Sequence, residues 1–176
     1  PLNTLGCRPC LTGSLTTGVD SFVGGANADT FNGYINTTVG NTTSTLTAAD
    51  VITGGAGVDT LAITVEGDVG GALPNATING VEKFSIRDVT TAGASVYDFA
   101  AVQGETEVTA NSSTRAVSFT SLATGTVVGV KGDGINTTGA VTFSMATGTD
   151  AVALALNGVK GSAVAATVTG KATSAT

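Results

Sequence analysis

Runs in which every second residue is apolar recur along the second half of the chain. Residues 117–119, 128–130, 141–143 and 152–156 place Val, Phe or Leu at alternate positions, separated by Ala, Ser, Thr or Gly. A period of two predicts strands that bury one face. The strands predicted in this half are 95–99, 107–110, 116–119, 126–130, 140–144, 151–156 and 163–168.

The first half carries a weaker version of the pattern. Phe84 and Ile86 alternate with Ser85, which predicts a strand within 78–88, whereas 34–47 is rich in Asn and Thr and predicts a polar hairpin or surface loop. In the second half, the residues between the apolar positions are small and uncharged, and the edge strands lack the lysines that usually block edge pairing. This pattern favours packing against another sheet or another copy of the chain, although a plain soluble sheet could also carry it.

Composition extends the all-β prediction to the whole chain. Gly, Thr, Ala and Val dominate its 176 residues, and charged residues make up 11%. Thr and Val favour strands, glycine favours turns, and strong helix formers such as Glu, Lys and Gln are scarce. Positive mean hydropathy together with few charges indicates an ordered chain.

Two segments thirty residues apart repeat one motif. Residues 24–31 read GGANADTF and 54–61 read GGAGVDTL; the second fits Gly-Gly-x-Gly-x-Asp-x-apolar without a departure. Nine residues before each aspartate stands another aspartate, Asp20 or Asp50, again followed by a strand-like residue pair. Glycines allow the backbone to turn its carbonyls toward one point, and aspartate supplies a hard oxygen ligand. The motif therefore predicts calcium-binding turns, although Gly-Gly and Asp-Thr are also ordinary turn residues.

The predicted metal ligands come from both copies of the motif. They are Asp20, Gly25, Asn27, Asp29, Asp50, Gly55, Gly57 and Asp59. Asn27 replaces a motif glycine, and asparagine tolerates the left-handed backbone that the turn needs. Taken with the alternation, the motif predicts an all-β fold, either a β-solenoid or a β-sandwich, built from short strands with Gly-Asp calcium-binding turns.

Charge supports a cation in this region. Seven acidic residues and no basic residue lie between Arg8 and Lys83, and the whole chain carries a net charge of −6. A bound divalent cation relieves the repulsion between uncompensated carboxylates, although a solvated acidic surface would also explain the sign of the charge.

Several classes of function are excluded or disfavoured. The chain has no histidine, so histidine-based catalysis and His-ligated zinc or iron are excluded. Its seven basic residues are scattered, which disfavours a phosphate-binding surface for nucleic acid, and no apolar run is long enough to span a membrane. The carboxylates Asp98, Glu105 and Glu107 are the best enzyme candidates, but the chain lacks a convincing nucleophile or base, and they are interpreted as surface groups.

Both cysteines lie close to the start of the chain, as Cys7 and Cys10. One Cys-x-x-Cys pair is half a zinc site, so a leader, a linker or a local disulfide is favoured over metal or redox chemistry. The expected organisation is a leader or linker over 1–14, an acidic calcium-turn region over 15–88, and a Gly/Thr/Val-rich strand region over 89–176 that continues it.

The motif residues 15–20, 22–31, 52–61 and 78–82 resemble bacterial surface-layer proteins and related exported proteins with calcium-binding repeats of the repeats-in-toxin type. The likeness covers about 15–168 and is specific in the first half. It implies export to the bacterial cell surface and assembly with calcium. One departure matters: family members stack many tandem nonapeptides, whereas each locus here holds two, so neighbouring loops or subunits would complete the sites.

The sequence thus predicts a non-enzymatic, extracellular structural protein that self-assembles into a surface layer, sheet or filament stabilised by calcium. Its expected partners are other copies of itself and a cell-surface polysaccharide, with no nucleic acid and no membrane span. The alternative is an adhesin or carbohydrate-binding module, which is ranked lower because Tyr34 and Tyr97 are the only tyrosines and tryptophan is absent.

Overall fold

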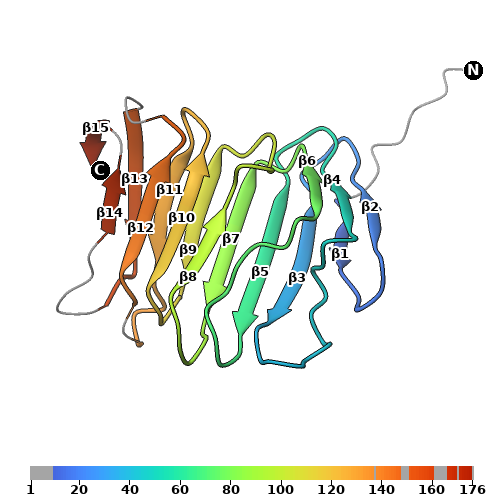
Figure 1. Cartoon of the computed structure of the whole chain (residues 1–176). Coiled ribbons are helices and arrows are strands. Elements are labelled where there is room, and N and C mark those ends of the chain that lie inside the picture. Colours follow the sequence, from blue (N-terminus) through green and yellow to red (C-terminus); the bar gives the residue numbers. More distant parts are fainter. Residues whose placement is uncertain (1–9, 137, 148–150, 161–165, 170, 176) are drawn as a thin grey trace, which may run out of the picture.

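In the computed structural model, residues 10–136, 138–147, 151–160, 166–169 and 171–175 are described. These residues form strands and loops, and all the strand pairs among them are parallel. Eight odd-numbered strands make one sheet in the order β1-β3-β5-β7-β9-β11-β13-β15 (Figure 1). The strands of this sheet are β1 (Thr12–Ser14), β3 (Thr30–Asn36), β5 (Thr60–Glu66), β7 (Lys83–Asp88), β9 (Glu107–Asn111), β11 (Val127–Lys131), β13 (Ala151–Asn157) and β15 (Lys171–Ala175).

Two smaller sheets contain the even-numbered strands. The first is three-stranded, in the order β2-β4-β6, and the second is four-stranded, in the order β14-β12-β10-β8. Their strands are β2 (Ser21–Val23), β4 (Val51–Thr53), β6 (Thr77–Asn79), β8 (Ser95–Asp98), β10 (Val117–Leu122), β12 (Val141–Met145) and β14 (Ala166–Thr169). We call the path from one odd-numbered strand to the next a winding. Each winding leaves the eight-stranded sheet, passes through the opposite layer and returns to the eight-stranded sheet.

The two smaller sheets do not continue one another. The onward partner of β6 is Gln103, which pairs with Asn79 in an isolated parallel bridge and lies after β8 in the chain. β8 pairs instead with β10, and its first residues contact a loop of the previous winding, where Val96 N–H donates to the carbonyl of Gly71 at 3.0 Å. The layer opposite the eight-stranded sheet is thus divided between β6 and β8.

The core lies between the large sheet and the smaller ones. Along β3, β5 and β7, every second residue is buried. Phe31, Leu61 and Phe84 pair across these strands and form one buried row. The four-stranded sheet adds an aromatic row in which the ring of Phe119 stacks on Tyr97 and Phe143, with centroids 5.5 and 5.2 Å apart. This packing explains the period of two in the sequence.

The predicted fold, a β-solenoid or β-sandwich built from short strands with Gly-Asp calcium-binding turns, is wrong. A sandwich of this kind needs antiparallel strands, and the described pairs are parallel. The prediction of a single regular solenoid is wrong because the second layer is divided into two sheets. The windings are also unequal in length: stacked residues lie 30 positions apart at Asp29 and Asp59 but 23 apart at Asp59 and Glu82. The carboxylates of the two Gly-Asp turns accept backbone N–H groups of the preceding winding.

The individual strand predictions in the second half are confirmed as far as they can be compared. The predicted 95–99, 107–110 and 116–119 correspond to β8, β9 and β10, and 126–130, 140–144 and 151–156 correspond to β11, β12 and β13, with ends that differ by no more than three residues. The predicted 163–168 overlaps β14, while its first residues lie outside the described residues. The polar segment 34–47 begins within β3 and continues as a loop.

Candidate functional site

The two Gly-Asp turns lie one directly above the other at the start of β3 and β5. Ala56 N–H donates to the carbonyl of Gly25 at 2.9 Å, which joins the glycine segments of the two turns. Asp29 N–H donates to Oδ1 of Asp59 at 2.7 Å, which joins their aspartates. The two copies of the motif lie thirty residues apart in the sequence, and the parallel register of β3 and β5 brings them into contact.

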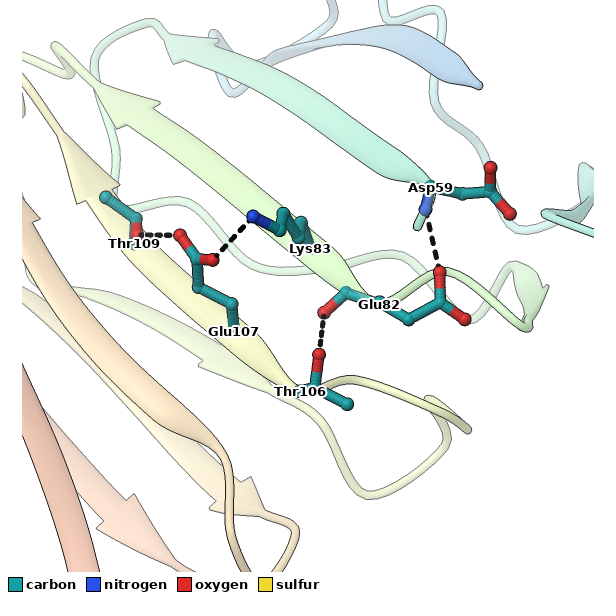
Figure 2. Close-up of polar contacts among 6 residues, drawn as sticks. All are labelled: Asp59, Glu82, Lys83, Thr106, Glu107 and Thr109. Atoms are coloured by element: carbon teal, nitrogen blue, oxygen red, sulfur yellow. Dashed lines mark hydrogen bonds and ion pairs between the residues drawn. The ribbon is translucent and has the colours of Figure 1, made fainter. Parts of the chain in front are cut away.

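A third carboxylate continues this arrangement. Asp59 N–H donates to Oε2 of Glu82 at 2.7 Å, immediately before β7 (Figure 2). We call Asp29, Asp59 and Glu82 the acidic stack. The same hydrogen bond recurs along the stack: each carboxylate accepts the backbone N–H of the residue that lies beside it in the preceding winding. For Asp29 this donor is the N–H of Leu11, at 2.6 Å. In the next winding the position is held by Thr106, and the stack ends there (Figure 2).

Glu82 was not among the predicted site residues. It lies in no Gly-Gly motif and follows Asp59 by 23 positions, so the nine-residue period could not find it. The available signal was local: Glu82 directly precedes a period-two strand, as Asp29 and Asp59 do.

Burial distinguishes the members of the stack. Asp29 and Asp59 are buried and Glu82 is half-buried. Desolvation by burial, followed by the negative charges of Glu82 and Asp29, raises the pKa of Asp59 above its ordinary value, and the hydrogen bond from Asp29 N–H opposes the rise. Among the described residues, the three carboxylates of the acidic stack lie close together and form no ion pair.

The two buried aspartates differ in their second oxygen. Oδ2 of Asp29 accepts the N–H of Gly25 at 2.5 Å, so both of its oxygens have donors. Oδ2 of Asp59 is buried and has no hydrogen-bond partner within the described structure. A buried acceptor left unpaired costs free energy, so this atom is the least satisfied polar group of the site.

The other two predicted aspartates form a separate pair in the opposite layer. Asp20 N–H donates to Oδ1 of Asp50 at 2.9 Å just before β2 and β4, following the same rule as the acidic stack. Oδ2 of Asp50 accepts Thr47 N–H at 2.7 Å, and the carboxylate of Asp20 accepts Thr16 N–H at 2.6 Å. The structure thus places Asp20 with Asp50 and Asp29 with Asp59, in two different stacks.

The glycines of the motif allow the turns to stack closely. Gly55 and Gly57 have φ of 105° and 121°, in the left-handed region that favours glycine. A carbon added at Gly57 would lie 2.6 Å from the carbonyl carbon of Asn27, so Asn27 stands directly against the other turn. A carbon added at Gly54 would collide with the carbonyl oxygen of Gly80 and lie 2.5 Å from Oδ2 of Asp59.

The residues of the two turns can offer a cation hard oxygen ligands, but few of these ligands at any one place are carboxylates. Within the described part of the chain, no three Asp, Glu, Cys or His side chains gather closely enough to hold a metal. Around Asp59 the available oxygens are its own Oδ2, the carbonyl of Gly80 and the carboxylate of Glu82. Calcium accepts such mixed carboxylate and carbonyl sets.

The carboxylates considered for catalysis have structural partners. Glu105 is buried, not a surface group as expected, and its Oε1 accepts Ala123 N–H at 3.0 Å. Glu107 forms an ion pair with Lys83 at 3.0 Å (Figure 2). Asp98 is exposed, and hydrogen bonds from Ser121 and Ala100 lower its pKa. Cys10 is exposed, and Cys7 lies outside the described residues.

Comparison of the chain with protein-family models, characterised proteins and solved structures finds no match. The described residues include no helix that is long and apolar enough to cross a membrane.

Proposed function

We propose that this chain is a non-enzymatic structural protein of the bacterial cell surface, whose copies associate into a layer, sheet or filament and whose windings are stabilised by calcium. The observation that carries the proposal is the acidic stack, which joins three successive windings and leaves Oδ2 of Asp59 buried without a donor. A divalent cation bound there would neutralise repelling carboxylates and link the windings.

Two further features support assembly. Among the described residues, β1 is the last strand at its end of the eight-stranded sheet and β2 is the last strand of its own sheet, so neither has a further described strand on that side. Val19 and Val23, beside this end, are 75% and 70% exposed. A second copy that added its strands at this edge would satisfy the backbone groups and cover apolar surface.

The calcium test compares thermal unfolding of the chain with excess calcium, with magnesium and with chelator. We expect calcium to raise the melting temperature, because a ligand that binds the folded state stabilises it by mass action. Asp59→Asn should abolish this increase, while Asp68→Asn, which removes an exposed carboxylate outside the stack, should retain it. A calcium effect equal in the two variants, or absent from the wild-type chain, would refute the proposed site.

The assembly test images the same samples by electron microscopy and measures their sedimentation. Ordered assemblies that form with calcium and dissolve in chelator are the expected result. A protein that stays monomeric at high concentration under both conditions would refute the assembly role, whatever the outcome of the calcium test.

A further inference from the structure

The outer face of the eight-stranded sheet carries a shallow trough across β9, β11 and β13. It has a volume of about 200 Å³ and is lined by Glu107, Thr109, Gly129, Val130, Lys131, Ala155 and Asn157. Its floor is a row of small residues, because Thr109 pairs with Gly129 and Gly129 with Ala155 across the strands. The trough therefore runs across the strands, in the direction in which the windings succeed one another.

One wall of the trough is a continuous row of polar side chains. Ile86 of β7 pairs with Ala110 of β9, so the next residues along these strands, Arg87 and Asn111, lie side by side. Asn111 pairs with Lys131 of β11, which pairs with Asn157 of β13. Arg87, Lys131 and Asn157 are exposed. Arg87 and Lys131, with the amide of Asn111 between them and that of Asn157 beyond, form a line of hydrogen-bond donors at the edge of the trough.

The part of the outer face formed by β7, β9 and β11 is positively charged, although Glu66, at the outward end of the neighbouring β5, is acidic. The outward positions of β7, β9 and β11 hold Lys83, Arg87 and Lys131 against a single acid, Glu107, in a chain whose net charge is −6. Glu107 is paired with Lys83 at 3.0 Å. Among the described residues, Arg87 and Lys131 make no ion pair, so their charges are available to a ligand.

We propose that the trough binds an acidic polysaccharide, a polymer of uronic-acid sugars lying across the strands. Arg87 and Lys131 belong to strands two apart in the sheet, about 9.5 Å at the ordinary strand spacing. That separation suits carboxylates on every second residue of an extended sugar chain. The amides of Asn111 and Asn157 and the hydroxyl of Thr109 are suited to the sugar hydroxyls between them.

The trough fits this occupant better than a protein or a nucleic acid. Protein interfaces are anchored by aromatic or aliphatic side chains in pockets, whereas the floor of Thr109, Gly129 and Ala155 carries no aromatic or large aliphatic side chain. Nucleic acid needs a denser set of cations than the three on this face. The site lies on different strands from the edge formed by β1 and β2, so the inference does not depend on the proposed assembly or on calcium.

The experiment measures binding of the full chain to polygalacturonic acid by calorimetry at low ionic strength and in chelator. The same polymer with its carboxylates methyl-esterified serves as the neutral probe. We expect binding of the acidic polymer, weakening with salt, and weak or no binding of the ester. Equal binding of the two polymers, or binding of neither, would overturn the proposal.

Variants locate the site. Arg87→Gln with Lys131→Gln should weaken binding roughly tenfold or more, because two charge-assisted hydrogen bonds are lost. Lys160→Gln, which removes an exposed cation from outside these strands, should leave binding unchanged. Equal loss in the double variant and in Lys160→Gln would indicate a diffuse charge effect and overturn the assigned site.

A steric variant tests the floor without changing charge. A carbon added at Gly129 would lie 2.9 Å from the Thr109 hydroxyl, which can rotate away, and valine is favoured in strands. Gly129→Val should therefore fold, as verified by circular dichroism, and weaken binding severalfold by filling the trough. Unchanged polymer binding in a folded Gly129→Val protein would place the ligand elsewhere. If the charge variants altered sedimentation without polymer and left polymer binding intact, the face would be a contact between copies and the proposal would fail.

Discussion

The backbone N–H of Asp29 donates to Oδ1 of Asp59 at 2.7 Å, although 30 residues separate the two aspartates. The bond belongs to a series in which each carboxylate of the acidic stack accepts the N–H of the winding before it. The series is not uniform, because both oxygens of Asp29 have donors whereas Oδ2 of Asp59 has none. Asp29 and Asp59 occupy equivalent positions of successive windings, but their carboxylates contribute differently to the stability of the folded protein.

Replacing each aspartate by asparagine should change stability in opposite directions. In chelator at neutral pH, Asp59→Asn should stabilise the protein by about 1–3 kcal/mol, because it removes an unpaired buried charge while Oδ1 still accepts Asp29 N–H. Asp29→Asn should destabilise it by a similar amount, about 1–3 kcal/mol, because its amide would face the N–H of Gly25 or Leu11. Urea unfolding measures both changes; shifts of the same sign would contradict the asymmetry.

The raised pKa of Asp59 predicts a pH dependence in the calcium-free protein. The folded state holds the proton of Asp59 more tightly than the unfolded state, whose pKa is near the ordinary value of 3.8. Its contribution to stability is therefore complete below that value and is lost as pH rises through the folded pKa. The stability gain of Asp59→Asn over wild type should grow across this interval. Unfolding of both proteins in a pH series measures it, and a constant difference would show that the pKa of Asp59 is not raised.

Gly54→Ala should destabilise the protein by about 1–3 kcal/mol, the usual cost of overpacking. The added methyl group would collide with the carbonyl oxygen of Gly80, which belongs to the backbone and cannot rotate away. Gly18→Ala is the matched control, because its added carbon would meet nothing nearer than the Thr16 hydroxyl at 3.6 Å. Chemical denaturation compares the two, and equal stabilities would mean that the turns do not approach as closely as described.

Tyr97→Phe should destabilise the protein by about 1–3 kcal/mol, because it leaves a buried carboxylate oxygen without its donor. The Tyr97 hydroxyl donates to Oδ2 of Asp88 at 2.6 Å, and both residues are buried. Desolvation and the hydrogen bond to Asp88 raise the pKa of Tyr97 far above its ordinary value, so the phenol remains a donor at neutral pH.

Tyr34→Phe serves as the control for that variant. The Tyr34 hydroxyl donates to Glu66 on the outer face, where the bond is exposed and water can replace it. Its removal should change stability by less than about 0.5 kcal/mol, as is usual at the surface. A larger loss from Tyr34→Phe than from Tyr97→Phe, measured by thermal unfolding, would contradict the burial assigned to Tyr97 and Asp88.

The candidate site could be predicted in part from sequence. The motif identified Asp29 and Asp59 because turn chemistry is local: a Gly-Gly pair followed by an aspartate directly before a strand is recognisable within a few residues. Glu82 could not be found in this way, because its place in the stack depends on which strand β7 pairs with. Sequence alone could not separate Asp20 and Asp50 from the acidic stack either, because they precede β2 and β4, which belong to the opposite layer.

The period of two in the sequence determined that the chain is β-structured, where most strands of the second half lie, and which side chains they bury. These features follow from neighbouring residues, because a strand alternates its faces whatever its partners are. The tertiary structure alone decided that the strands pair in parallel, that the second layer is divided between β6 and β8, and that Asp59 is left with an unpaired oxygen. Those properties depend on contacts between residues eighteen or more positions apart, and the apolar pattern is compatible with several such pairings.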